Sequence, residues 1–475
     1  MRKSPRRAIK REITPSFNKP LPEYKINFFV IFIASIAAIG GILFGFDTGV
    51  ISGAILFIKH QYLLSSFENG VVVSASLIGA VLGSATSGWS ADYFGRKRSL
   101  MFASLIFMAG TLGSAFAMSI PHLIESRFVL GFAIGIASFT APLFISEIAP
   151  PRMRGALVSL NQLAVTVGIF VSYFVDEYYA KTGAWRWMFG VGVVPAALLF
   201  IGLLFLPYSP RWLCSKGKVQ KAFYTLRNIR RTPHVRAEFS AIRASLEEEG
   251  GWQDLFKKWL RPAILIAVGL GFFQQFTGIN TVIYYAPTIF KLSGFTSDSV
   301  AILATMGIGA INVTATIVSL FLIDRLGRKP LLYFGMTLMA LCLFALSISF
   351  AFDQSAALKW IAFASLFFYV IGFAVSLGPI MWLMFSEVFP IKVRGVAMSI
   401  MASIQWLFNF IVSLTFLTLI KYFHGSGTFG LYGVICLIGI LFVYYKVPET
   451  KDVSLERIER NLRSGLAARD LGNNN

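Results

Sequence analysis

SEIAPPRMRG at residues 146–155 occurs a second time as SEVFPIKVRG at residues 386–395, 240 positions further along the chain (386 − 146). Serine, glutamate, proline, arginine and glycine keep their places in both copies, and the seventh place is basic in each. A second motif repeats in the same order, as DYFGRK at 92–97 and DRLGRK at 324–329, 232 positions apart (324 − 92). Two unrelated motifs at nearly one spacing predict a duplicated half of about 235 residues, a pattern typical of membrane transporters.

Composition also indicates a membrane protein. Of the 475 residues, 56% are hydrophobic and 14% are charged, whereas charged residues make up roughly a quarter of an average soluble protein. An uncharged apolar run of about 20 residues spans the hydrocarbon core of a bilayer. We expect an all-α integral membrane protein with twelve transmembrane helices, at residues 26–57, 68–91, 98–118, 122–145, 155–178, 185–206, 262–291, 298–323, 330–351, 357–385, 394–421 and 427–447.

The repeat and the charges together predict the domains. Residues 1–25 form a basic tail, 26–206 the first six-helix bundle, 207–261 a linker, 262–447 the second bundle and 448–475 a charged C-terminal tail. In the linker, apolar residues recur at helical spacing, which predicts short amphipathic helices at the cytosolic face. These residues are Leu226, Ile229, Val235, Phe239, Ile242 and Leu246.

The distribution of basic residues predicts the orientation. They gather in the tails, the linker and alternate connections, so the positive-inside rule puts both termini in the cytosol. The connections assigned to the outside are poorer in basic residues and hold acids such as Asp176 and Glu177. The net charge of +20 comes with no nucleic-acid fold motif, so the partner we expect for this charge is the lipid bilayer and not a nucleic acid.

The duplicated motifs place opposite charges at helix ends. In the first copy they are Asp92 with Arg96 and Arg154 with Glu147, and in the second copy Asp324, Arg328, Glu387 and Arg394 correspond to them. Such groups can meet the helix dipole and pair across helices. A network that is made and broken at one face suits a cytosolic gate. The alternative is that loop charges only fix the topology, which is the better interpretation for any single lysine or arginine.

Four further motifs complete the pattern: PYSPRWL at 207–213, QQFTGIN at 274–280, GPIMW at 378–382 and PETK at 448–451. With the duplicated loops they make residues 26–460 resemble the sugar-porter branch of the major facilitator superfamily. The resemblance implies the major facilitator fold of two six-helix bundles, with the substrate near mid-membrane between them. Tyr93 and Tyr208 depart from the pattern, because the family usually has a basic residue and a glutamate there. Both changes weaken the expected charge network.

Amide side chains gather in the stretch 262–291. Gln274, Gln275 and Asn280 lie in a run that is otherwise Gly, Phe, Thr and Ile. Amides carry both donors and acceptors, as a polyol needs, but they also form hydrogen bonds between membrane helices, so the residues alone leave both roles open. The resemblance implies sugar binding by Gln162, Gln274, Gln275, Asn280, Trp382 and Gln405. We also expect contacts from Asn312, Phe44 and Tyr284, although for Phe44, Tyr284 and Trp406 the spacing alone favours core packing.

Two further features bear on the mechanism. Gly378-Pro379 is expected to break the helix 357–385 so that it can bend. Asp47 lies in GFDTG at 45–49, in a run without another charge between Lys25 and Lys59. An ionisable group at membrane depth is a functional candidate.

Depth suggests a partner for Asp47. Asp47 lies 22 residues after Lys25, and Arg127 lies 20 residues before Glu147. At about 1.5 Å per residue both are roughly 30 Å from the cytosolic face, so they can meet. In such a pair the arginine keeps the carboxylate ionised, and protonation releases it. The alternatives are an aspartate near the outer helix end and an arginine that extends to the interface.

The resemblance favours symport over facilitation. Asp47 and Arg127 match the pair associated with proton coupling in bacterial xylose and related sugar symporters. Facilitative animal glucose transporters typically have Asn at the position of Asp47 and Glu at the position of Ala374.

We therefore expect a monomer in the bacterial cytoplasmic membrane that imports a monosaccharide with a proton, without a cofactor or a metal. Passive facilitation by the same fold is the alternative. A signalling receptor is disfavoured because the tails carry no signalling module, and an enzyme because no catalytic constellation is present. The sequence leaves xylose, glucose, galactose, arabinose and inositol open.

Overall fold

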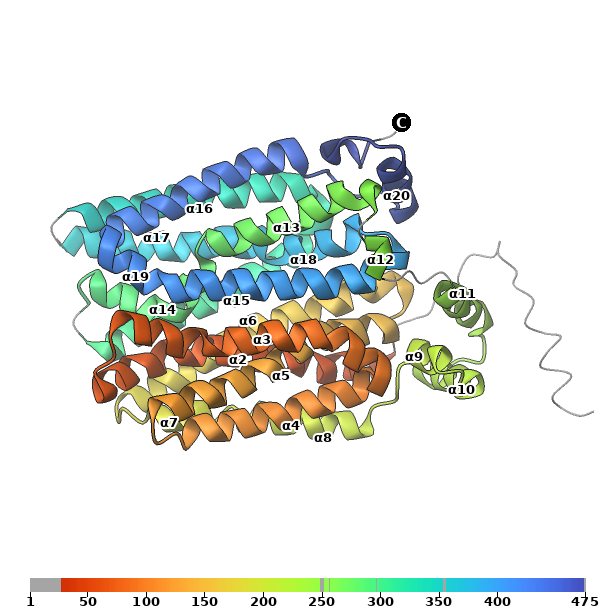
Figure 1. Cartoon of the computed structure of the whole chain (residues 1–475), viewed down its shortest axis with the longest axis horizontal. Coiled ribbons are helices and arrows are strands. Elements are labelled where there is room, and N and C mark those ends of the chain that lie inside the picture. Colours follow the sequence, from red (N-terminus) through yellow and green to blue (C-terminus); the bar gives the residue numbers. More distant parts are fainter. Residues whose placement is uncertain (1–26, 248–251, 256, 296, 353–355, 474–475) are drawn as a thin grey trace, which may run out of the picture.

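The computed structural model describes residues 27–473 except 248–251, 256, 296 and 353–355, so the predicted tail 1–25 lies outside the described residues. Every regular element in the described part of the chain is a helix. The long helices run side by side, and the linker helices and α20 (Leu455–Arg463) lie at one end of the molecule (Figure 1). We call this end the linker face and the other end the opposite face.

Long apolar runs form helices because a helix satisfies its own backbone hydrogen bonds in lipid. The first half consists of α2 (Phe28–Tyr62), α3 (Ser66–Phe94), α4 (Arg96–Ala115), α5 (Ile120–Ile148), α6 (Arg154–Ala180), and α7 (Trp185–Gly190) continued by α8 (Val193–Phe205). The second half consists of α13 (Arg261–Phe276) continued by α14 (Ile279–Leu292), α15 (Asp298–Leu326), α16 (Arg328–Ala351), α17 (Ala356–Val375) continued by α18 (Leu377–Val388), and α19 (Ile391–Lys446).

The helix α19 accounts for two of the predicted spans. It has 56 residues, which is about 84 Å of helix and well over twice the thickness of a bilayer core. Its backbone leaves the helical conformation at His424, with φ 57° and ψ 178°. Eleven helical segments of the described chain are long and apolar enough to cross a membrane. Because α19 is divided at His424, they make the twelve predicted crossings.

Helix packing defines two halves and the seam between them. In the first half α2 lies along α6 and α3 along α5, and in the second half α16 lies along α17 and α19. The halves meet where α3 lies along α19 and α6 along α15. Small residues allow the closest approaches: a Cβ on Gly131 of α5 would stand 1.8 Å from the carbonyl oxygen of Ser76 on α3. Only glycine fits at that position.

The linker forms a small unit of its own. It contains α9 (Pro210–Ser215), α10 (Val219–Arg230), α11 (Arg236–Glu247) and α12 (Trp252–Leu255). Leu226, Val235 and Phe239 are buried against Trp212 and Leu213 in a core separate from that of the long helices. The predicted amphipathic helices are therefore observed.

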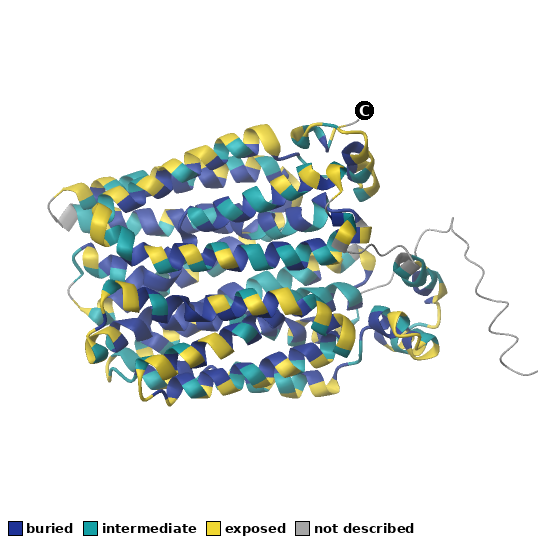
Figure 2. Ribbon diagram, viewed as in Figure 1, coloured by how far each residue is buried: buried dark blue, intermediate teal, exposed yellow. Residues whose placement is uncertain are grey.

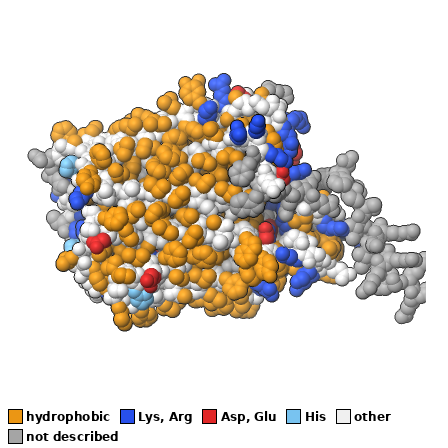
Figure 3. Space-filling model, in the orientation of Figure 1, with side chains coloured by type: hydrophobic (Ala, Val, Ile, Leu, Met, Phe, Trp, Pro, Cys, Tyr) orange, Lys and Arg blue, Asp and Glu red, His pale blue; other side chains and the backbone are white. Residues whose placement is uncertain are grey.

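The surface matches a protein surrounded by lipid. Buried residues line the inside of the helix assembly, while exposed residues form stripes on its outside (Figure 2). Over the length of the helices these exposed side chains are mostly hydrophobic, and lysine and arginine gather at the linker face (Figure 3). Large apolar side chains such as Phe321 and Leu341 are 68% and 63% exposed.

Candidate functional site

The helix that carries the three predicted amides is broken beside them. It ends as α13 at Phe276 and resumes as α14 at Ile279, because Gly278 has φ +92°, a conformation that favours glycine. Gln275 and Asn280 flank the break, and the Asn280 amide donates to Gln275 Oε1 at 2.5 Å. Gln275 in turn donates to Gln274 Oε1 at 3.3 Å. The three amides therefore form one connected group.

A second broken helix lies against this group. The helix divides at Ser376, with φ −126° and ψ −99°, into α17 and α18. Pro379 has no N–H to donate to the preceding turn, so the predicted break is confirmed three residues before the proline. Gln274 donates to the carbonyls of Leu377 and Gly378, at 3.0 and 3.3 Å. Trp382 lies on α18, half-buried, with its ring edge-on to Phe385 at 5.7 Å.

Gln405 on α19 joins the amides. Its side-chain nitrogen donates to Gln274 Oε1. The side chain is buried, and its own oxygen has no hydrogen-bond partner among the described residues. We define Gln274, Gln275, Asn280 and Gln405 as the amide cluster. A buried acceptor without a partner is costly, so this cluster offers a polar position to a ligand.

Aromatic side chains next to the cluster connect the two halves. Phe44 on α2 and Trp406 on α19 pack edge to face with ring centroids 4.9 Å apart. The Trp406 indole donates to the hydroxyl of Ser138 on α5 at 3.4 Å. Tyr284 on α14 is buried, and its hydroxyl accepts a hydrogen bond from Asn409 at 3.1 Å. Asn409 was not predicted, although it follows Gln405 by four residues and so lies on the same face of α19.

Gln162 and Asn312 are the predicted contacts that the structure leaves apart from the cluster. Gln162 is half-buried on α6 and Asn312 is buried on α15, and these two helices pack together at the seam. Within the described part of the chain, no hydrogen bond joins either residue to the amide cluster.

Asp47 and Arg127 meet, as their depth predicts. Arg127 Nη1 lies 3.2 Å from Asp47 Oδ1, and their side chains are 1% and 5% exposed. Arg127 also donates to the carbonyl of Val72 at 2.9 Å and to the hydroxyl of Ser76 at 3.0 Å, both on α3. The guanidinium lies 5.5 Å from the centroid of the Phe189 ring. A buried charge pair of this kind persists only when its remaining donors are satisfied, and here α3 supplies the acceptors.

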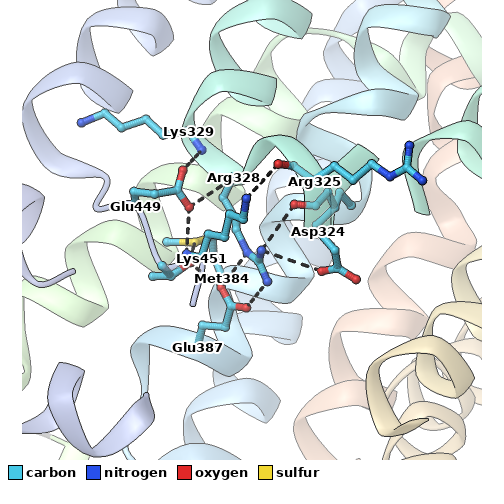
Figure 4. A network of polar contacts seen from close by, with 10 residues as sticks. Asp324, Arg325, Arg328, Lys329, Met384, Glu387, Glu449 and Lys451 are labelled. Atoms are coloured by element: carbon cyan, nitrogen blue, oxygen red, sulfur yellow. Dashed lines mark hydrogen bonds and ion pairs between the residues drawn. The ribbon is translucent and has the colours of Figure 1, made fainter. Parts of the chain in front are cut away.

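The duplicated charges form one cluster in each half at the linker face. In the first, Arg96 pairs with Asp92 and with Glu147, both at 2.9 Å. In the second, Arg328 pairs with Glu387 at 2.7 Å and approaches Asp324 at 3.9 Å (Figure 4). In both halves the arginine of the DYFGRK or DRLGRK motif bonds the glutamate of the SEIAPPRMRG or SEVFPIKVRG motif.

Arg154 and Arg394 do not form the ion pairs that we expected. We expected opposite charges to meet as Glu147 with Arg154 and Glu387 with Arg394, but both glutamates bond the other arginine. Arg154 is exposed, and Arg394 donates to the carbonyl of Phe389 at 3.2 Å. The reason is position. Arg96 and Arg328 begin α4 and α16 and reach the ends of α5 and α18, whereas Arg154 and Arg394 lie in the first turns of α6 and α19, the helices that follow.

The two halves differ in the contacts that stabilise the starts of α4 and α16. Glu449 accepts from the backbone nitrogens of Arg328 and Lys329 at 3.1 and 2.9 Å, so it caps the start of α16 (Figure 4). In the first half, no side chain among the described residues is hydrogen-bonded to the first backbone nitrogens of α4 as Glu449 is to those of α16. There the Trp212 ring covers Gly95, and its indole donates to the Asp92 carbonyl at 2.9 Å.

The two tyrosines that depart from the family pattern both lie next to cations. The Tyr208 ring stacks on Trp212 and lies 5.3 Å from Lys97 and 5.6 Å from Lys221, while the Tyr93 ring lies 5.8 Å from Lys216. At Tyr208, cation–π contacts with Lys97 and Lys221 take the place of the ion pairs that the expected glutamate would form.

Two hydrogen bonds join the halves at the opposite face, and at the linker face two glycines of different halves have open space beside them. At the opposite face Tyr173 donates to the Ile283 carbonyl at 2.9 Å, and the Ser299 hydroxyl donates to Glu177 at 3.1 Å. At the linker face Gly155 and Gly395, near the starts of α6 and α19, have no atom within 4 Å of the place that a Cβ would take. Contacts between the halves therefore close the opposite face, whereas at the linker face there is open space beside the starts of α6 and α19.

Comparison with known proteins agrees with this architecture. Residues 33–462 match the family model described as Sugar (and other) transporter. The chain is 42% identical over 452 residues to the galactose-proton symporter of Escherichia coli strain K12, covering 94% of this chain and 97% of the symporter. It is 44% identical over 441 residues to the D-xylose transporter of Levilactobacillus brevis, covering 91% and 96%.

Among solved structures, the xylose transporter XylE from E. coli in a partially occluded inward open conformation superposes with a TM-score of 0.79 at 33% identity, over 90% of this chain and all of that one. The proton:xylose symporter XylE bound to 6-bromo-6-deoxy-D-glucose gives 0.77 at 34% identity, over 91% and 98%. These proteins are transporters and not enzymes. The chain has the major facilitator fold and belongs to the Sugar (and other) transporter family.

Proposed function

We propose that this protein imports a monosaccharide together with a proton by alternating access of two six-helix bundles, 26–206 and 262–447. The observation that carries the proposal is the Asp47–Arg127 pair, with its two atoms 3.2 Å apart and both side chains at most 5% exposed. An arginine favours the ionised carboxylate, so binding of a proton to Asp47 breaks the pair and frees Arg127. An ionisable pair that changes state inside the membrane can couple a proton to a movement of the bundles.

The amide cluster is the proposed sugar site. Its members present donors and acceptors at the breaks in two helices, which is where transporters of this architecture bind their substrates. The unpartnered oxygen of Gln405 would accept from a sugar hydroxyl. Phe44, Tyr284 and Trp382 would pack against the apolar face of the ring. Gln162 and Asn312 face the seam from α6 and α15 and would complete the site when the bundles close on the sugar.

The charge clusters of the linker face are the proposed cytosolic gate. In the open arrangement each cluster is satisfied inside its own half, through Arg96 and Arg328. Arg154 and Arg394 would engage the clusters when the linker face closes, which is the switching role that we assign to them.

The positive-inside rule makes the linker face cytosolic, with both termini on that side. The bacterial relatives support a place in the cytoplasmic membrane. We propose that a single chain, surrounded by lipid, is the working unit.

Transport assays test the proposal directly. Purified protein in liposomes is offered radiolabelled xylose, glucose, galactose or arabinose, with and without an inward proton gradient. Accumulation of one sugar above its external concentration, abolished by a protonophore, is expected. Equilibration without accumulation would instead identify a passive facilitator and leave Asp47 a structural residue.

A further inference from the structure

Asp176 is a buried carboxyl group that the sequence assigned to an outer connection. The structure corrects this assignment, because Asp176 lies within α6, four residues before its end, and is 0% exposed. Its Oδ2 accepts from the backbone nitrogen of Gly53 on α2 at 3.1 Å. Its Oδ1 has no hydrogen-bond partner among the described residues. The burial of Asp176 therefore depends on tertiary structure, because a turn of α2 covers its side chain.

The carboxyl group of Asp176 packs directly against the backbone of Gly53. A Cβ on Gly53 would lie 2.6 Å from both Cγ and Oδ2 of Asp176, so no larger residue fits without a shift of the helices. The close approach is what allows an α2 backbone N–H to reach the carboxyl oxygen. The contact is between two helices of the same half, well inside the assembly.

Three other buried carboxylates make the contrast clear. Asp47 has Arg127 at 3.2 Å, Glu147 has Arg96 at 2.9 Å, and Glu238 has Arg230 at 2.6 Å. Asp176 is buried as deeply, yet no lysine, arginine or histidine in the described residues forms an ion pair with it. A charged carboxylate is far more costly to bury without a cation than a neutral acid is.

The ionisable groups on the elements packed around α6 do not supply the missing charge. On α6 itself the Tyr173 hydroxyl donates to the Ile283 carbonyl, and Glu177 accepts from Ser299. On α2, Asp47 pairs with Arg127 of α5, and Lys59 is exposed. On α7, Arg186 lies against the Trp185 ring, and on α15, Asp298 pairs with Lys291.

We propose that Asp176 is a second proton-binding site, which holds its proton while the opposite face is closed and releases it when that face opens to water. Two residues near Asp176 on α6 hold the opposite face closed. Tyr173, one turn earlier, and Glu177, next in sequence, make the contacts across the seam at the opposite face. Opening breaks both contacts and brings water to this end of α6, where an ionised carboxylate is tolerated. The proton on Asp176 therefore favours the closed opposite face, independently of the proton that Asp47 exchanges.

Infrared spectroscopy tests the protonation of Asp176 on the full-length protein. At neutral pH the wild type should show a carbonyl stretch of a protonated carboxylic acid in a dry environment. Asp176→Asn should lose this band, because the amide keeps the shape and the acceptor for Gly53 but carries no acid. Asp470→Asn, the same change at the C-terminal end of the chain, and Asp47→Asn should both keep the band. A band that persists in Asp176→Asn, or that is absent from the wild type, would overturn the proposal.

A second measurement tests the link to opening. Spin labels at Lys181 and Ser297, both exposed at the opposite face and in different halves, report the separation of the halves there. In the wild type the longer distance should gain population as the pH rises, and in Asp176→Asn this response should be lost. An unchanged pH response in Asp176→Asn would refute the role in gating. Neither measurement needs sugar or a proton gradient, so a failure here is distinct from a failure of symport.

Discussion

Replacement of Asp47 by asparagine separates transport from coupling. Asp47 and Arg127 lie 3.2 Å apart, so at the effective dielectric constant of about 20 that suits protein sites their attraction is about 5 kcal/mol. Asparagine removes this attraction but keeps a neutral acceptor. Arg127 also keeps Val72 and Ser76 as partners on α3. Loss of one partner of a buried pair usually costs about 3 to 5 kcal/mol, and these remaining contacts put the loss near 3 kcal/mol. Asp47→Asn should therefore fold with a lower Tm.

The effect of Asp47→Asn on sugar accumulation is a clearer test of coupling than its effect on stability. One pH unit is worth about 1.4 kcal/mol, so two units can drive roughly 100-fold accumulation of sugar if one proton accompanies each molecule. In liposomes with this gradient Asp47→Asn should reach a ratio of one, because asparagine cannot carry the proton. Exchange of internal for external sugar should continue, since the amide cluster is intact. Asp470→Asn, the same change at the C-terminal end of the chain, should accumulate sugar like the wild type. Accumulation above a ratio of one by Asp47→Asn would show that another group couples the proton.

Four further changes test other parts of the structure. Glu449→Gln removes the carboxylate that caps α16 at Arg328, so the protein should lose about 1 to 2 kcal/mol of stability, seen as a lower Tm by tryptophan fluorescence. Tyr208→Glu places a carboxylate at the equivalent position of the first half, where α4 has no side-chain cap, and should raise the Tm; a fall would mean that the cation–π contacts outweigh the cap. Asn280→Ala should raise the KM for sugar about tenfold, the effect of one lost hydrogen bond to a ligand, and an unchanged KM would remove Asn280 from the site. Burial raises the pKa of the Cys214 thiol, so its alkylation by a maleimide should be slow at neutral pH and accelerate at alkaline pH, and a fast reaction at neutral pH would contradict that burial.

Much of the architecture could be predicted from local sequence. The apolar runs predicted twelve crossings, and the repeat of SEIAPPRMRG at 386–395 predicted two related halves. The structure has the twelve crossings when α19 is divided at His424. The break before Pro379 and the amphipathic linker helices were also predictable, because both follow from a few neighbouring residues.

Parts of the candidate site were predictable too, each for its own reason. Gln275 and Asn280 are close in sequence, so their contact depends only on the turn at Gly278. The meeting of Asp47 with Arg127 was predictable from depth alone, since α2 begins and α5 ends at the same charged face and both residues lie a similar number of residues from it.

The sequence by itself determined the membrane-spanning helices, the duplication and the residue types available for a sugar and a proton, because hydrophobic length and motif spacing are local properties of the chain. Only the tertiary structure decided which partner each charge takes. Arg96, and not Arg154, bonds Glu147, since the start of α4 lies beside the end of α5. Asp176 is buried against Gly53, with no cation paired to it among the described residues, although the sequence assigned it to an outer connection. Partnership and burial depend on which helices lie side by side, and that arrangement comes from packing across the whole assembly.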